Sequence, residues 1–150
     1  MRTMRLALIS LLAAGIAGSV HAAPPAKDII ATKEAPAAVG PYSQAVRAGN
    51  MVFLAGQLPI DPKTGQTRNG PIEEQAAQVL DNLKAVLAAD GMSMDNVVST
   101  TVYVKNLDDF PKLNAVYGKY FTDKPPARAT VQVDRLPKDV AVEISAIAVR

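Results

Sequence analysis

The sequence contains no cysteine, and this absence excludes several kinds of chemistry at once. Without a thiol the chain cannot form disulfides, bind a metal through thiolates or use a cysteine nucleophile. Histidine is nearly absent as well, because His21 is the only one in the sequence. No Gly-Lys-Ser or Gly-Lys-Thr run is present, so a nucleotide-binding phosphate loop is also excluded.

Residues 1–22 have the pattern of a signal peptide for export. A start with two arginines is followed by an apolar run from Leu6 to Gly18, and Val20 and Ala22 are the small residues that a signal peptidase reads. The run is too short to span a bilayer as a permanent helix, and no cysteine follows it that could carry a lipid. The alternative is a helix anchored at a membrane surface. We expect export to the periplasm of a bacterium, or secretion, with cleavage near Ala22 and no stable membrane anchor.

Removal of this segment changes the charge and the catalytic inventory of the chain. It takes away Arg2, Arg5 and His21 but no acidic residue, so residues 23–150 carry equal numbers of basic and acidic side chains. A balanced charge argues against a broad surface for nucleic acid. Without histidine and cysteine, a Ser-His-Asp triad, a Cys-His dyad and an ordinary zinc site are excluded. Glu, Asp, Tyr, Lys and Arg remain as candidates for catalysis.

Hydrophobic periodicity predicts a single α+β domain over residues 23–150. Helices are expected over 72–90 and from a cap at Asp108 or Asp109 to the residues before Asp123, because apolar side chains recur there at three- and four-residue spacing. The segments expected to form strands are 28–32, 42–48, 51–57 and 96–105, with two more within 125–149. The order is therefore β-β-β-α-β-α-β-β, with both helices covering one face of a mixed sheet.

The strand Met51–Gln57 is almost entirely apolar, which favours a central strand covered on both sides. Two helices cannot hide both faces of a sheet of this size. We therefore expect the chain to oligomerise through the face that the helices leave open.

The stretch Pro125–Val149 combines two apolar strands with one charged residue in each. Arg128 and Glu143 fall on the polar side of their strands. If the strands pair as a hairpin around Arg135 and Leu136, the two side chains lie opposite each other. A guanidinium and a carboxylate held in this way could bind a small acid and handle its protons. The alternative is an ordinary cross-strand ion pair, worth a fraction of a kcal/mol.

Four short runs in this order resemble the Rid family (reactive intermediate deaminase, YjgF-like), and the likeness covers Ile30 to Arg150. The runs are AAVGPYSQ (37–44), AGQ (55–57), PPARAT (125–130) and LPK (136–138) continuing through EI (143–144). The resemblance implies a chorismate-mutase-like fold assembled as a homotrimer, with active sites in clefts between subunits. Members of the deaminase branch hydrolyse imines and enamines, such as 2-aminoacrylate, to 2-oxo acids and ammonia without a cofactor or metal.

The resemblance also implies three catalytic residues, Arg128, Glu143 and Tyr42. Arg128 falls on the arginine that holds the substrate carboxylate, and Glu143 falls on the acid that orients water. The chemistry agrees, because a 2-imino acid presents a planar carboxylate that arginine can bind through two parallel hydrogen bonds. Glu143 can position water or exchange a proton with the nitrogen. Such imines already hydrolyse in water, so orientation and one acid–base group suffice.

Three positions are implied in substrate binding besides Arg128: Gly56 through its backbone, Asn114 from the second helix, and Thr130. The sequence departs from many family members at two of its positions, with Thr130 in place of cysteine and Ala55 in place of serine. Both differences change the shape of the expected pocket without removing Arg128 or Glu143.

Two other functions stay open. A non-catalytic ligand-binding or chaperone-like trimer would use the same cleft or its apolar surface. Endoribonuclease activity has been attached to this family as well, but a balanced charge and the lack of histidine in residues 23–150 disfavour it.

Overall fold

The computed structural model describes residues 26–150, so the expected export signal and the expected cleavage near Ala22 lie outside the described residues. In chain order the elements are β1 (Lys27–Ile30), β2 (Ala45–Ala48), β3 (Met51–Gln57), α1 (Ile72–Ala89), β4 (Val97–Val104), α2 (Phe110–Tyr120), β5 (Ala127–Gln132) and β6 (Val142–Val149). This order confirms the predicted one. Neither helix in residues 26–150 combines the length and the apolar character needed to cross a membrane.

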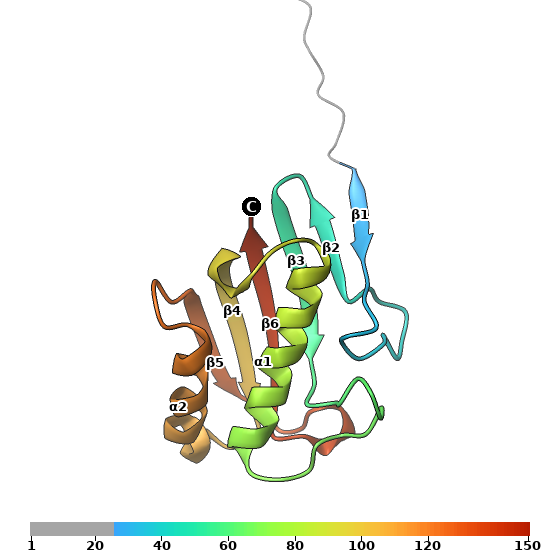
Figure 1. Cartoon of the computed structure of the whole chain (residues 1–150). Coiled ribbons are helices and arrows are strands. Elements are labelled where there is room, and N and C mark those ends of the chain that lie inside the picture. The colour runs from blue at the N-terminus through green and yellow to red at the C-terminus, as the bar shows by residue number, and fades with distance from the viewer. Residues whose placement is uncertain (1–25) are drawn as a thin grey trace, which may run out of the picture.

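The strands form one mixed sheet in the order β1-β2-β3-β6-β4-β5. β4 and β5 are parallel, and all other neighbours are antiparallel. Both helices lie on the same side of the sheet, as Figure 1 shows. The predicted α+β architecture, with two helices on one face of a mixed sheet, is confirmed.

The hairpin predicted within 125–149 is wrong, because β4 lies between β5 and β6. The reason is the crossover through α2, since a strand–helix–strand unit places its two strands parallel and adjacent. β6 then pairs with the other edge of β4 and with β3. In this register Arg128 pairs with Thr100 of β4, and Glu143 pairs with Tyr103.

The core lies between the helices and the inner face of the sheet. β6 contributes every second side chain to it, and these are Val142, Ile144, Ala146 and Ala148. α1 packs its predicted apolar stripe on this layer through Ile72, Ala76, Val79, Leu80, Leu83, Val86 and Leu87, all of them buried. Burial of one large aliphatic side chain contributes about 1.5–3 kcal/mol, so this layer supplies much of the stabilising apolar burial.

The face of the sheet opposite the helices, here called the outer face, is uncovered. It carries Phe53, which is 42% exposed, and Val131, which is 43% exposed. The prediction that Met51–Gln57 is covered on both sides is therefore wrong for the single chain, because both helices pack on the inner face. Apolar side chains gathered on an uncovered sheet face are typical of an interface with another protein surface.

Buried amide side chains hold the loops against this framework. Gln44 accepts a hydrogen bond from the Thr32 N–H at 2.6 Å and donates to the carbonyl of Pro36 at 2.7 Å. Asn82 of α1 donates to the carbonyls of Leu58 and Ile60, each at 3.0 Å. These bonds replace the water that the loop carbonyls would otherwise bind, so the loops are held in one arrangement.

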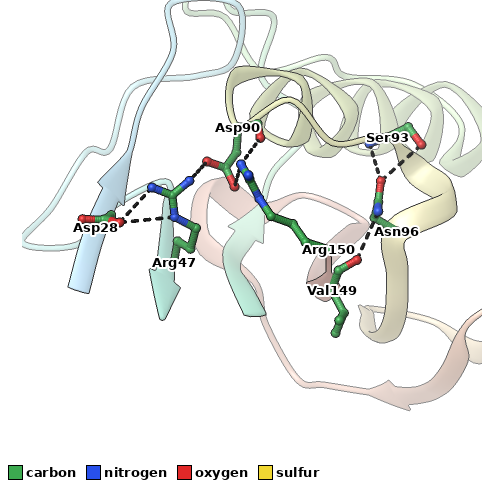
Figure 2. A network of polar contacts seen from close by, with 7 residues as sticks. All are labelled: Asp28, Arg47, Asp90, Ser93, Asn96, Val149 and Arg150. Carbon is green, nitrogen blue, oxygen red and sulfur yellow. Dashed lines mark hydrogen bonds and ion pairs between the residues drawn. The ribbon is translucent and has the colours of Figure 1, made fainter. Parts of the chain in front are cut away.

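A cluster of charged residues joins the end of α1 to the end of β6 (Figure 2). The buried carboxylate of Asp90 pairs with Arg47 at 2.7 Å and with Arg150 at 3.1 Å. Nearby, the Asn96 side chain donates to the carbonyl of Val149 at 3.1 Å. The last residue of β6 and the residue after it are thus fixed by two side chains from other parts of the chain, Asn96 and Asp90.

Replacement of Asn82 by Ala leaves the carbonyls of Leu58 and Ile60 without their donor. We expect Asn82→Ala to lower the free energy of unfolding by about 2–4 kcal/mol, since each buried acceptor that loses its partner costs about 1–3 kcal/mol. Urea unfolding at one fixed protein concentration measures the change. Lys84→Ala, an exposed position on the same helix, is the control and should change stability by less than about 0.5 kcal/mol. Equal effects of the two variants would contradict the role of Asn82.

Candidate functional site

The expected site residues fall into two groups on opposite faces of the sheet. Arg128 pairs with Thr100, which is buried beneath α2, so its side chain lies on the helix side. Glu143 alternates with the buried residues of β6, so its side chain lies on the outer face. The expectation that these two side chains lie opposite each other in one chain is therefore wrong.

The first group surrounds Arg128 in an open pocket of about 410 Å³, here called the arginine pocket. It is lined by Leu107, Phe110, Arg128 and Thr130. Asn114 of α2 accepts a hydrogen bond from Nη2 of Arg128 at 2.8 Å. The structure thus brings together three of the expected substrate-binding residues: Arg128, Asn114 and Thr130.

Two aromatic rings of α2 also contact the guanidinium of Arg128. Its central carbon lies 4.5 Å from the centroid of the Tyr117 ring and 5.3 Å from that of Phe110. Both distances lie within the range of cation–π attraction. Sequence reasoning assigned these rings only to the buried stripe of the helix. The spacing of Phe110, Asn114 and Tyr117 at i, i+4 and i+7 was the available signal that they share one face with Asn114.

Arg128 has no carboxylate partner among residues 26–150. One hydrogen-bond donor of its guanidinium is used by Asn114, and the others remain for a ligand. The planar fork of a guanidinium matches the two oxygens of a carboxylate. The arginine pocket is therefore suited to a small organic acid.

The second group surrounds Glu143 in a pocket of about 290 Å³, here called the glutamate pocket. Its lining is mostly apolar and consists of Val39, Tyr42, Ala55, Gly56, Leu58, Pro137 and Glu143. Three expected site residues, Glu143, Gly56 and Tyr42, are brought together here. Leu58 and Pro137 come from loops to which sequence reasoning had assigned no role.

Gly56 lies directly against the carboxyl group of Glu143. The pairing of β3 with β6 shifts by one residue between Leu54 and Gln57, so Gly56 sits in a bulge of β3. A Cβ atom at this position would overlap Oε1 of Glu143 and would lie 2.8 Å from its carboxyl carbon. The lack of a side chain at Gly56 is thus what allows the carboxyl group to occupy its place.

Burial raises the pKa of Glu143 above its ordinary value of 4.5. Within the described part of the chain, no hydrogen bond or ion pair offsets this effect. A carboxyl group in an apolar setting holds its proton to higher pH and can act as an acid as well as a base.

Tyr42 stands at the mouth of the glutamate pocket with an exposed ring. Its hydroxyl accepts a hydrogen bond from the Val39 N–H at 3.4 Å, and its own N–H donates to the carbonyl of Gly40 at 2.8 Å. The preceding loop is tied down by Gln44, so Tyr42 is presented by a short and well-bonded turn.

A strained turn forms another wall of the glutamate pocket. Lys138 and Asp139, which follow Pro137, both have a φ of 59°, a left-handed conformation that is costly for residues other than glycine. Lys105 holds the turn by donating to Asp139 at 2.8 Å, and this bond lowers the pKa of Asp139. Gln75 of α1 accepts a bond from the Ala141 N–H at 2.8 Å and fixes the far end of the turn.

No group of three or more histidine, cysteine, aspartate or glutamate side chains within residues 26–150 is arranged to hold a metal ion. The described residues supply a guanidinium that can bind a carboxylate, and a carboxyl group with a raised pKa. These two functions belong to separate pockets of one chain.

Comparison with known proteins places this arrangement among relatives. Residues 32–150 match the family described as endoribonuclease L-PSP. The 2-iminobutanoate/2-iminopropanoate deaminase of Escherichia coli is 52% identical over 81% of this chain and 96% of its own length.

Two solved structures show the same fold. The crystal structure of RidA from an Antarctic Psychrobacter species has a TM-score of 0.80 and 46% identity, and covers 82% of this chain and 99% of its own. That of TdcF from E. coli with bound serine has a TM-score of 0.79 and 45% identity, and covers 82% and 98%. The four motifs, the sheet order and the family match agree, and the chain belongs to the Rid family, which is described in the family comparison as endoribonuclease L-PSP.

Proposed function

We propose that this protein hydrolyses 2-imino and 2-enamino acids to 2-oxo acids and ammonia, as an imine/enamine deaminase. The observation that carries the proposal is the guanidinium of Arg128, which lies in an open pocket, contacts Asn114 and two aromatic rings, and has no carboxylate partner within residues 26–150. A cation held in this way is prepared for an anionic ligand.

Two relatives support this choice of ligand. The E. coli relative at 52% identity is named for its action on 2-iminobutanoate and 2-iminopropanoate, which are small 2-imino acids. E. coli TdcF binds serine, another small molecule with a carboxylate and a nitrogen on the adjacent carbon. Both have the chemical features that the arginine pocket can recognise.

A complete site requires more than one copy of the chain. The arginine pocket opens on the helix side of the sheet and the glutamate pocket on its outer face, so one small molecule cannot touch both in a single chain. We propose that the arginine pocket of one subunit meets the glutamate pocket of the next.

Such an interface joins two different surfaces and is therefore heterologous, and a heterologous contact cannot form a two-fold dimer. The smallest closed ring it can form is a trimer. The uncovered apolar outer face supports a homotrimer, because assembly would remove that surface from water.

In the expected reaction Arg128 binds the substrate and Glu143 carries out the proton transfers. Arg128 binds the carboxylate and thereby fixes the position of the adjacent C=N carbon. Glu143 in its protonated form donates a proton to the nitrogen, which makes the carbon more electrophilic. The resulting carboxylate takes a proton from the attacking water and returns it to the nitrogen. The C–N bond then breaks as the new hydroxyl group gives its proton to the Glu143 carboxylate, so the products are the 2-oxo acid and ammonia, and Glu143 is protonated again. An enamine first takes up a proton at C3 to give the imine.

The deaminase activity can be tested by producing a 2-imino acid with an amino-acid oxidase and trapping it with semicarbazide. Added protein should suppress trapping. Arg128→Ala should lower kcat/KM by roughly a hundredfold, because it removes a charge-assisted pair of hydrogen bonds. Arg128→Lys should retain part of the activity, since it keeps the charge but loses the planar fork. Equal suppression by the wild type and Arg128→Ala would contradict the mechanism.

The proposed location of the site between two subunits can be tested separately. Arg128→Ala and Glu143→Gln chains are each expected to keep about one hundredth of the wild-type activity. Mixed assemblies, however, contain interfaces that combine the intact Arg128 of one chain with the intact Glu143 of the other. With equal amounts of the two chains unfolded and refolded together, about one quarter of the interfaces should be complete. Recovery of about that share of wild-type activity supports the arrangement, and no recovery contradicts it.

Cleavage of single-stranded RNA that is lost in Glu143→Gln would instead favour the nuclease activity of the family description.

Glu143→Gln should affect activity and stability in opposite directions. The loss of the acid–base group should lower kcat about a hundredfold. The raised pKa of Glu143 means that the folded state binds the proton more tightly than the unfolded state, so stability is lost as pH rises through that pKa. Gln carries no charge, so the variant should melt at a higher temperature than the wild type at pH 7. The difference should vanish below pH 4.5, the ordinary value. A lower melting temperature at pH 7 would contradict this and would mean that the Arg128 guanidinium of the neighbouring subunit outweighs the burial of Glu143 in the assembly.

We also propose export of the chain to the periplasm or the outside, supported by the pattern of residues 1–22. Expression of the full chain in a bacterium, followed by fractionation and N-terminal sequencing, tests the proposal. The mature chain should begin near Ala23 in the periplasmic fraction. An unprocessed chain in the cytoplasm would contradict it.

A further inference from the structure

The ring that contacts the guanidinium of Arg128 belongs to Tyr117, whose hydroxyl group is itself hydrogen-bonded inside the core. The hydroxyl groups of Thr100 and Tyr117 lie 2.7 Å apart and are hydrogen-bonded. Both side chains are buried, with exposed fractions of 2% and 6%. This bond joins β4 to α2 inside the core.

The register of the sheet places this bond beside the arginine. Thr100 on β4 is the direct neighbour of Arg128 on β5. The ring of Tyr117, whose hydroxyl is bonded to Thr100, lies against the guanidinium of Arg128, with the guanidinium carbon 4.5 Å from the ring centroid. The ring is also packed against Phe121, with the centroids 4.6 Å apart.

We propose that Tyr117 and Thr100 are positioning residues, which hold the guanidinium of Arg128 in the orientation that receives a carboxylate. The inference deepens the proposed function and rests on it for the identity of the substrate. Tyr117 supplies a flat surface for the guanidinium, and Thr100 sets the position of that surface. Asn114 then fixes the rotation of the guanidinium through Nη2.

An arginine side chain has several freely rotating bonds, and an arginine free in solvent must give up this freedom when it binds a ligand. Contact with an aromatic face removes part of the freedom before binding occurs. The two partners should therefore affect the affinity for the carboxylate more than the rate of the chemical step. Burial raises the pKa of Tyr117, so its hydroxyl stays neutral and bonded to Thr100 over the ordinary range of pH.

The alternative is that the Thr100–Tyr117 bond serves only the core. A purely structural bond would change stability when it is removed and would leave ligand affinity unchanged. The two possibilities therefore differ in the dissociation constant for a carboxylate, and also in how the loss depends on Arg128.

The test measures binding of 2-oxobutanoate by calorimetry, alongside KM and kcat for imine hydrolysis. Tyr117→Leu removes the ring and should raise Kd and KM roughly 3- to 30-fold, the range of a cation–π contact, with kcat changed less than about threefold. Tyr117→Phe keeps the ring and Thr100→Val keeps the volume, and each removes the hydroxyl bond. Both should raise Kd about two- to fivefold, and the double variant should be no weaker than either single one, because both remove the same bond.

Tyr120→Phe is the matched control. It removes another tyrosine hydroxyl of α2, one that bonds Asp81 at 2.9 Å and does not contact Arg128. Its Kd should equal that of the wild type. Arg128→Lys removes the planar group that stacks on the ring. In that background Tyr117→Leu should raise Kd less than about threefold.

The inference is overturned if Thr100→Val and Tyr117→Phe both bind 2-oxobutanoate as tightly as the wild type. It is also overturned if Tyr117→Leu costs as much in the Arg128→Lys background as in the wild-type background, or if the wild type does not bind 2-oxobutanoate. The two hydroxyl variants decide the matter even if Tyr117→Leu does not fold. The binding measurement needs no turnover. Wild-type protein that binds 2-oxobutanoate but does not hydrolyse imines would therefore contradict the proposed function, and the Kd values of the variants would still decide whether Tyr117 and Thr100 position Arg128.

Discussion

The alternation of side chains along the strands, and along β6 in particular, determines on which face of the sheet the core and each charged site residue lie. Its even-numbered residues form the floor of the core beneath the helices, and the residues between them, Glu143 first, emerge on the outer face. On β5, two strands away in the sheet, the same rule directs Arg128 to the helix side. Since successive side chains of a strand always point to opposite faces, no rearrangement of loops can bring the two groups together in one chain. The need for a second copy at the proposed site is therefore a consequence of strand geometry.

Hydrogen-bonded amide side chains hold both pockets in shape. Gln44 and Asn82 fix the loops that present Tyr42 and Leu58 to the glutamate pocket. Around the arginine pocket the same task falls to Asn114 on one side of the guanidinium. Gln44 and Asn82 are buried, and both the oxygen and the nitrogen of each amide are hydrogen-bonded. A satisfied buried network favours one conformation over its alternatives. Pockets of this kind can orient a small molecule without first paying the entropy of ordering their walls.

The sequence predicted the elements and their order well because their signals are local. The stripe of α1 and the alternation of Val142–Val149 can be read from consecutive residues. The partner of each strand cannot, because it depends on contacts between distant segments. The expected hairpin followed from nearness along the chain, whereas the α2 crossover placed β4 between its two strands. The pattern of β5 did not show which of its faces lies toward the core. Its apolar Ala129 and Val131 point outward, while Arg128 and Thr130 face the helices. The role of Gly56 required knowing that Glu143 lies beside it, since a glycine at a strand end has many uses.

The central place of β6 also means that the sheet can be completed only after this strand has been made. β1, β2 and β3 form one half of the sheet, β4 and β5 form the other, and β6 alone joins the two halves. It is also the last of these strands to leave the ribosome. Until then each half has an open edge and an apolar face with no partner, which exposes the nascent chain to aggregation. Closure must bring together segments far apart in the sequence, and such contacts make folding slow. Chaperones that protect incomplete chains would therefore act mainly before Val142–Val149 has been made.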